Sequence, residues 1–189
     1  MKLLVLDNYD SFTYNLVHVV KAIGGADLTV LRNDQLAASD ALEFDKILLS
    51  PGPGIPEEAG VMPEIIKTCA DSKSILGVCL GHQGIAEAFG GSLTNIEQVY
   101  HGIASEIQVT DPSEVLFAGL PEKLEVGRYH SWIVNRDNLP DVLKVTAETE
   151  DGTAMAIRHL ALDVAGVQFH PESVLTPEGK TMIENWLKN

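Results

Sequence analysis

A cysteine between two glycines is the strongest indication of chemistry in this sequence. Cys79 lies in the segment GVCLG at 77–81, after an apolar run of strand length and before a helical pattern. Glycines two residues to either side allow a tight strand-to-helix turn, which strains the nucleophile's backbone and lifts its sulfur out of the sheet. The following helix presents its positive end to a thiolate. We therefore predict that Cys79 is a nucleophile, whereas Cys69, on an apolar helix face, is expected to be a buried structural thiol.

A histidine and a glutamate two residues apart supply the base that this nucleophile needs. His170 and Glu172 belong to the segment QFHPE at 168–172, which ends a late apolar run. Proline disfavours the helical conformation for the preceding residue, so His170 is expected to be extended. Residues i and i+2 of an extended chain point the same way, which places Glu172 beside the imidazole to orient it. No second histidine or cysteine lies near His170 at ligand spacing, so no metal site is expected.

A rigid loop of alternating proline and glycine, SPGPG at 50–54, follows the third short apolar run. Its two glycines, Gly52 and Gly54, allow backbone N–H groups to approach a ligand closely. The loop does not match a phosphate-binding pattern, because Glu57 and Glu58 follow where a cation would be needed. We expect it instead to donate hydrogen bonds to a developing oxyanion, where one donor is typically worth about 10²–10³ in rate.

Short apolar runs alternate with helical periodicity and predict an α/β fold. Strands are expected at 3–6, 28–31, 47–49, 75–78 and 164–169, and helices at 12–23, 62–70, 80–89 and 177–187. Asp10 or Ser11 is expected to cap the first helix. This alternation implies right-handed βαβ units in an open, mostly parallel sheet with helices on both faces. Such sheets bind ligands at the carboxyl ends of their strands, where the candidate residues lie.

The middle of the chain changes character and predicts an antiparallel extension of that sheet. Five short strand-like segments, separated by proline, glycine and aspartate turns, occur at 105–110, 124–129, 133–135, 142–146 and 155–158. No linker or internal repeat interrupts the sequence, so residues 1–189 are expected to form a single domain.

Composition limits the classes of function. The 189 residues include 13 Lys and Arg against 27 Asp and Glu, which gives a net charge of −14. This balance argues against binding to nucleic acid or to an anionic membrane surface. Two cysteines do not make a disulfide framework. No secretory segment or apolar run of roughly 20 residues is present, so a cytoplasmic setting is expected.

Three motifs together resemble the class I glutamine amidotransferases, which have a flavodoxin-like fold. These are PGPG at 51–54, GVCLGHQ at 77–83 and FHPE at 169–172. The segments DNYDSFTYNL at 7–16 and RYHS at 128–131 narrow the resemblance to amidotransferase subunits. They are similar to component II of anthranilate synthase and, almost equally, to that of aminodeoxychorismate synthase.

The resemblance implies a role for each matching residue. Cys79 would attack the side-chain amide of L-glutamine to form a γ-glutamyl thioester. His170 would take the thiol proton and pass it to departing ammonia, with Glu172 orienting the ring. The glutamine pocket and the oxyanion hole would be formed by Gly52, Pro53, Gly54, Leu80, Gln83, Ser131 and Trp132.

The resemblance also implies a partner chain. Ammonia becomes ammonium in neutral water, so a glutaminase without an acceptor domain would deliver it along a shielded path. The partner would be a synthase subunit that binds chorismate and Mg²⁺, whereas this chain would need no cofactor. Tryptophan synthesis is the pathway favoured here, and folate synthesis is the alternative. The segment at 10–14 is a candidate docking surface, in which Phe12 is either a contact or part of the core.

Two other classes of function remain open at this stage. A stand-alone cysteine peptidase or esterase would explain the turn at Cys79, but not the Pro-Gly loop together with the His-Pro-Glu segment. A non-catalytic binding module would be expected to have lost Cys79, His170 or Glu172, and all three are present.

Overall fold

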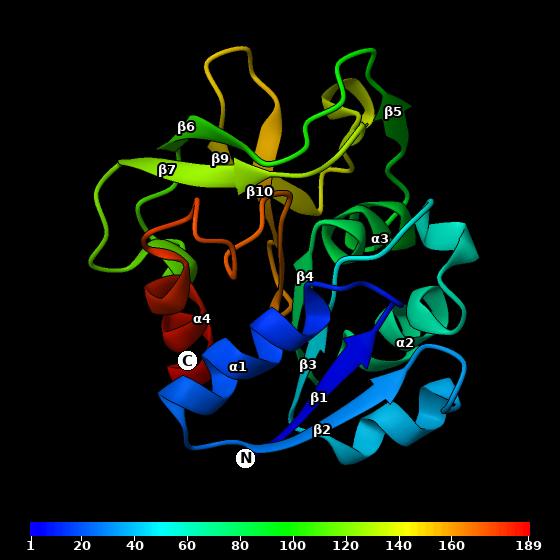
Figure 1. Ribbon diagram of the computed structural model, residues 1–189. Coiled ribbons are helices and arrows are strands. Elements are labelled where there is room, and N and C mark those ends of the chain that lie inside the picture. Colours follow the sequence, from blue (N-terminus) through cyan, green and yellow to red (C-terminus); the bar gives the residue numbers. More distant parts are fainter.

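A nine-stranded sheet forms the centre of the molecule in the computed structural model, which describes residues 1–189 (Figure 1). The strand order is β2-β1-β3-β4-β11-β10-β9-β6-β7. The parallel strands are β1 (Lys2–Asp7), β2 (Asp27–Arg32), β3 (Lys46–Leu49), β4 (Ser74–Val78) and β11 (Val164–Val167). The antiparallel strands are β10 (Ala154–His159), β9 (Leu143–Glu148), β6 (Ile103–Val109) and β7 (Lys123–Arg128). The predicted α/β class and mostly parallel sheet are confirmed.

Helices cover both faces of the parallel part. The four α-helices are α1 (Thr13–Ile23), α2 (Met62–Cys69), α3 (Leu80–Ala88) and α4 (Gly179–Lys188). Figure 1 shows α1 and α4 side by side on one face and α2 and α3 on the other. Successive strand residues point to opposite faces, so Leu3 and Val5 join the core under α1 and α4, whereas Leu4 and Leu6 join the core under α2 and α3. Short 3₁₀ turns complete the chain at η1 (Ala38–Glu43), η2 (Pro56–Glu58), η3 (Val115–Phe117) and η4 (Arg136–Asn138).

Cys69 lies on the buried face of α2, in the core that this helix shares with α3, as expected for a structural thiol. None of the helices is both long enough and apolar enough to cross a membrane.

One of the predicted antiparallel segments does not extend the main sheet. The segment predicted at 133–135 forms β8 (Trp132–Val134), which pairs with β5 (Leu93–Asn95) in a separate two-stranded sheet. The prediction was wrong because residues 129–131 turn away from β7, and the Tyr129 ring packs on the imidazole of His170. Strand β5 was missed because it is only three residues long and largely exposed.

The ends of two elements also differ from expectation. Strand β11 stops at Val167, because the backbone N–H of His170 donates to Gly127 O on β7. Helix α1 begins at Thr13 without a side-chain cap. Asp10 Oδ1 accepts the N–H of Phe12 instead, at 2.7 Å, and so closes the turn just before the helix.

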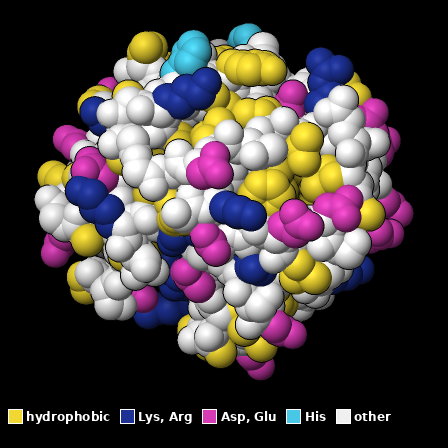
Figure 2. All heavy atoms as spheres, turned by 90° about the horizontal axis from the view of Figure 1, so that it is seen from below, with side chains coloured by type: hydrophobic (Ala, Val, Ile, Leu, Met, Phe, Trp, Pro, Cys, Tyr) yellow, Lys and Arg dark blue, Asp and Glu magenta, His cyan; other side chains and the backbone are white.

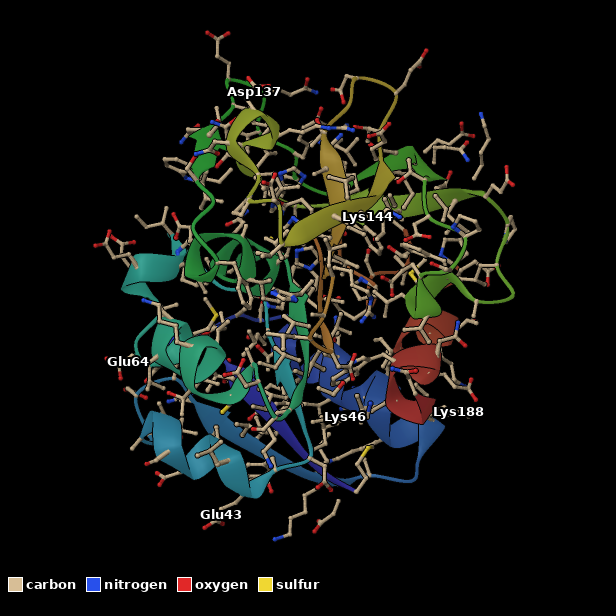
Figure 3. All side chains as sticks on the ribbon, turned by 180° about the vertical axis from the view of Figure 1, so that it is seen from behind. Glu43, Lys46, Glu64, Asp137, Lys144 and Lys188 are labelled. Atoms are coloured by element: carbon tan, nitrogen blue, oxygen red, sulfur yellow. The ribbon has the colours of Figure 1, made fainter.

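The amino ends of the strands are fixed against α4 by a buried lysine, labelled in Figure 3. Lys46 Nζ donates to Trp186 O at 2.9 Å and lies 5.2 Å from the centre of the Trp186 ring. Burial lowers the pKa of Lys46. Around this end of the molecule, acidic and basic side chains alternate over the surface (Figure 2). The excess negative charge is therefore not gathered into one patch on this face.

A threonine ties the loop after β11 to β7. Thr176 Oγ1 accepts the backbone N–H of Gly127 at 2.9 Å and donates to His170 O at 2.7 Å. Both bonds are buried, so loss of the hydroxyl leaves two backbone groups without partners. This hydroxyl holds the backbone of His170 at a fixed place relative to the sheet.

We expect Thr176→Val to lower the free energy of unfolding by about 1–3 kcal/mol, because it strands a buried donor and a buried acceptor. Thr176→Ser keeps the hydroxyl and should recover most of that loss. Thr146→Val is the matched control, since the Thr146 hydroxyl is buried without a hydrogen-bond partner. Urea unfolding followed by circular dichroism measures all three variants. Equal stabilities of the two valine variants would contradict the role assigned to Thr176.

Candidate active site

The turn at Cys79 has the strained geometry that its sequence predicts. Cys79 has φ +51° and ψ −99°, and Tyr9 is the one other non-glycine residue with positive φ. A Cβ on Gly77 would lie 2.4 Å from the carbonyl carbon of Gly81, and one on Gly81 would lie 2.7 Å from Leu49 Cβ. Neither position has room for a side chain. Backbone strain of this kind gathers at functional sites, and here it places the sulfur at the carboxyl end of β4.

His170 and Glu172 form a buried pair, as predicted from their spacing. Nδ1 of His170 lies 2.6 Å from Oε1 of Glu172, and the two side chains are 2 % and 0 % exposed. The other ring nitrogen, Nε2, is buried and takes part in no hydrogen bond of ordinary geometry. Glu172 therefore holds Nδ1, and Nε2 is the nitrogen left to exchange a proton with the sulfur.

The charges around His170 favour the protonated ring. Burial alone lowers the pKa of His170, but the neighbouring side chains of Cys79 and Glu172 raise that pKa from 6.5 to about 10. The imidazolium is consequently the form of His170 favoured at neutral pH. The sulfur and the imidazole are thus close enough to interact, which brings the first two predicted motifs together.

The proline–glycine loop contacts the turn at Cys79 where Gly52 lies against Leu80. A Cβ on Gly52 would lie 2.5 Å from Leu80 Cδ2 and 2.8 Å from the backbone oxygen of Asn8, so the backbone leaves no room for a side chain at this contact. The start of the loop is fixed by Asn8, whose N–H donates to Ser50 Oγ and whose Nδ2 donates to Ser50 O, both at 2.9 Å. The outer part of the loop, Pro53 and Gly54, is exposed.

A chain of hydrogen bonds connects α3 to β8. Gln83 Nε2 donates to Trp132 O at 3.0 Å and to Gln168 Oε1 at 3.2 Å. His130 Nδ1 lies 3.1 Å from the same Trp132 carbonyl, and Arg128 Nε donates to His130 Nε2 at 3.1 Å. Arg128 thus fixes the tautomer in which Nδ1 donates.

Burial and the charge of Arg128 lower the pKa of His130 to about 3, which keeps this ring neutral. Ser131, the remaining predicted pocket residue, lies beside these groups in the chain and accepts the N–H of Ile96 through its carbonyl.

Three residues lie at the site although the sequence did not place them there. The rings of Phe12 and Tyr129 lie 5.2 and 4.8 Å from the imidazole of His170. Phe12 is half-buried and outside both core clusters, so the interpretation of it as a core residue was wrong. Gln168 Nε2 lies 3.6 Å from Cys79 Sγ. The sequence places Gln168 in the strand expected at 164–169, but no local pattern indicates that this strand pairs with β4.

The reacting groups themselves are well covered, with Cys79 6 % and His170 2 % exposed. A surface hollow of about 780 Å³ lies elsewhere, over β6 and β7, and shares only Arg128 with the residues described above. No group of three or more His, Cys, Asp or Glu side chains has an arrangement suited to a metal ion.

Comparisons with known proteins agree with this arrangement. The family model for glutamine amidotransferase class-I matches residues 4–189. Anthranilate synthase component 2 of Pseudomonas putida is 48 % identical, over 100 % of this chain and 97 % of the relative. The aminodeoxychorismate/anthranilate synthase component 2 of Bacillus subtilis is 46 % identical, over 98 % and 95 %. A solved structure from Thermoplasma acidophilum, described as a putative GMP synthase subunit, has a TM-score of 0.88 at 28 % identity, over 100 % and 92 %.

Titration of His170 tests the electrostatics of the pair. We expect its ring, followed by NMR, to stay protonated through neutral pH and to titrate towards 10, and Glu172→Gln to lower that midpoint. Glu184→Gln on the exposed side of α4 is the control. Because the pKa of His170 is higher in the folded state than in the unfolded state, protonation of His170 stabilises the fold. This contribution to the free energy of unfolding is complete below about pH 6.5 and is lost as the pH rises towards 10. A midpoint near 6.5 in both the wild type and Glu172→Gln would contradict this picture.

Proposed function

The chain belongs to the class I glutamine amidotransferase family, and on that premise we propose that it hydrolyses L-glutamine at Cys79 and passes the ammonia to a chorismate-binding synthase subunit. The observation that carries the proposal is the strained Cys79 beside a buried His170–Glu172 pair. The proposal makes this chain the amidotransferase subunit of anthranilate synthase.

In the proposed reaction, the first half begins with Cys79 as a thiolate and His170 as an imidazolium. The Cys79 thiolate attacks the amide carbon of glutamine, and the carbonyl oxygen gains the negative charge. The N–H of Leu80 and an N–H of the loop at 50–54 hold this oxyanion. His170, already protonated, gives its Nε2 proton to the amide nitrogen, and the C–N bond breaks to leave ammonia and the γ-glutamyl thioester.

The second half regenerates the thiolate. His170 is now neutral and takes a proton from a water molecule, whose oxygen attacks the thioester carbon. The C–S bond then breaks, which restores the thiolate and imidazolium and releases the product as a carboxylic acid, which loses its proton to solvent to become glutamate. Glu172 keeps Nδ1 engaged in both halves, so the same nitrogen, Nε2, first gives and then takes the proton.

The hydrogen bonds of Gln83 define what it offers to the substrate. Both hydrogens of its amide nitrogen are used, by Trp132 O and Gln168 Oε1. Its Oε1 is the atom left, and it suits the α-ammonium of glutamine. The Trp132 carbonyl is similarly occupied by Gln83 and His130, so Ser131 and Trp132 would hold the substrate through their other atoms.

The partner follows from the product and from the relatives. The Pseudomonas putida relative is named component 2 of a synthase, which supports a companion subunit for this chain. We propose that this companion holds chorismate and Mg²⁺, that this chain needs no cofactor of its own, and that tryptophan synthesis is the pathway. A second candidate is aminodeoxychorismate synthase in folate synthesis, because the Bacillus subtilis relative bears both names.

Replacement of the nucleophile tests the reaction. We expect Cys79→Ala to lower glutamine hydrolysis, measured as ammonia release, by roughly 10⁴-fold or more, because no other group can form the thioester. Cys69→Ala removes the second thiol, which is buried in α2, and should keep the activity. Retention of activity by Cys79→Ala would refute the proposal. Faster turnover of peptide or ester substrates than of glutamine would favour a stand-alone hydrolase.

Addition of the partner tests the pathway. We expect the rate of glutamine hydrolysis to rise when component 1 of anthranilate synthase and chorismate are added to the full chain. Component 1 of aminodeoxychorismate synthase is the parallel arm. Stimulation by the second alone would assign folate synthesis, and stimulation by neither would refute the role in a synthase complex.

A further inference from the structure

Gln168 is level with Cys79 because of strand register. Strands β4 and β11 are parallel neighbours, with Val78 paired to Val167. The next residues are Cys79 and Gln168, and the N–H of Cys79 donates to Val167 O at 2.8 Å. Gln168 is 0 % exposed, and its amide nitrogen is 3.6 Å from the Cys79 sulfur. Burial of a polar side chain costs desolvation free energy, which the hydrogen bonds of Gln168 must offset.

The direction of the Gln168 amide is set from the far end of a hydrogen-bond chain. The Trp132 carbonyl can only accept, so the atom of Gln83 beside it is the amide nitrogen. That nitrogen also donates to Gln168, which therefore presents its oxygen to Gln83. The Gln168 nitrogen is consequently the end that faces the sulfur, and an N–H points at Cys79 rather than a lone pair.

We propose that Gln168 is a further catalytic residue, which donates a side-chain N–H hydrogen bond to the Cys79 thiolate. The inference rests on the proposed role of Cys79 as the nucleophile. Hydrogen bonding to a charged group favours its charged form, and the effect is larger where water is excluded.

A neutral amide supplies a hydrogen-bond donor that does not lose its proton during the reaction, unlike the imidazolium. His170 loses its proton to ammonia in the first half of the reaction and regains one only when water attacks the thioester, so its positive charge is not constant through the cycle. The Gln168 amide does not titrate and stays in place throughout. It therefore stabilises the thiolate both as the attacking group and as the leaving group.

The test measures how the reactivity of the Cys79 sulfur depends on pH. In a Cys69→Ala background Cys79 is the single thiol. The rate of its alkylation by iodoacetamide is followed against pH. A hydrogen bond to the charged form is strong enough to shift a pKa by about one to two units, so we expect Gln168→Met to raise the pH of half-maximal alkylation by about one to two units. The same variant should lower kcat for glutamine about tenfold, with KM changed less than about threefold.

A near-isosteric variant and a matched control complete the design. Gln168→Glu replaces the N–H donor by a carboxylate oxygen and should raise the alkylation midpoint further; it decides the question if Gln168→Met does not fold. Gln108→Met removes a glutamine on β6 whose amide donates only to Val109 O, and should leave the midpoint unchanged. Thermal unfolding identifies any variant that has lost its fold.

The outcomes separate this inference from the function on which it rests. An unchanged midpoint in the folded Gln168 variants would overturn the role of Gln168 and leave the proposed reaction intact. Alkylation of the wild type by an electrophilic glutamine analogue that glutamine fails to block would count against the function itself. A loss of kcat without a shift in the midpoint would mark Gln168 as structural only, and would also overturn the inference.

Discussion

The parallel pairing of β4 with β11 is the constraint on which the site depends. It places residues that are 89 positions apart in the chain, Cys79 and Gln168, at the same level of the sheet. His170 follows two residues later, and Thr176 and Gly127 hold its backbone to β7. The parallel half of the sheet therefore supplies the nucleophile, and the antiparallel half fixes the base. Neither half of the sheet forms the site by itself.

Close approach of backbones is the second condition for this chemistry. Glycine at 77 and 81 lets α3 start directly at the sheet, and Gly52 lets the loop touch Leu80. Cys79 and His170 are almost fully buried in the resulting site, so the sulfur, the imidazolium and the carboxylate interact through a medium that screens charge weakly. This explains why the pKa of His170 rises although burial opposes its charge. The electrostatics of the site thus depend on positions that carry no functional group.

Local patterns predicted much of this molecule, and long-range contacts account for the rest. The flanking glycines of Cys79 and the spacing of His170 and Glu172 are local signals, and the structure confirms the turn and the buried pair. The parallel strands were readable because each is a short apolar run. The pairing of β8 with β5 was not, since three-residue strands carry almost no pattern. The contacts of Gln168 were equally hidden, because they depend on strand register rather than on sequence spacing. Its partners are Gln83 in α3 and Cys79 in the turn after β4.

The position of β11 has a consequence for how the protein is made. This strand lies at the centre of the sheet, between β4 and β10, yet it leaves the ribosome after all the other strands of that sheet. Until it arrives, the nascent chain exposes β4 as an open edge, which is the kind of surface that pairs with other chains or recruits a chaperone. It also lacks His170, Glu172 and Gln168. The Cys79 thiol of the nascent chain therefore has no base beside it, and its reactivity depends on the insertion of β11.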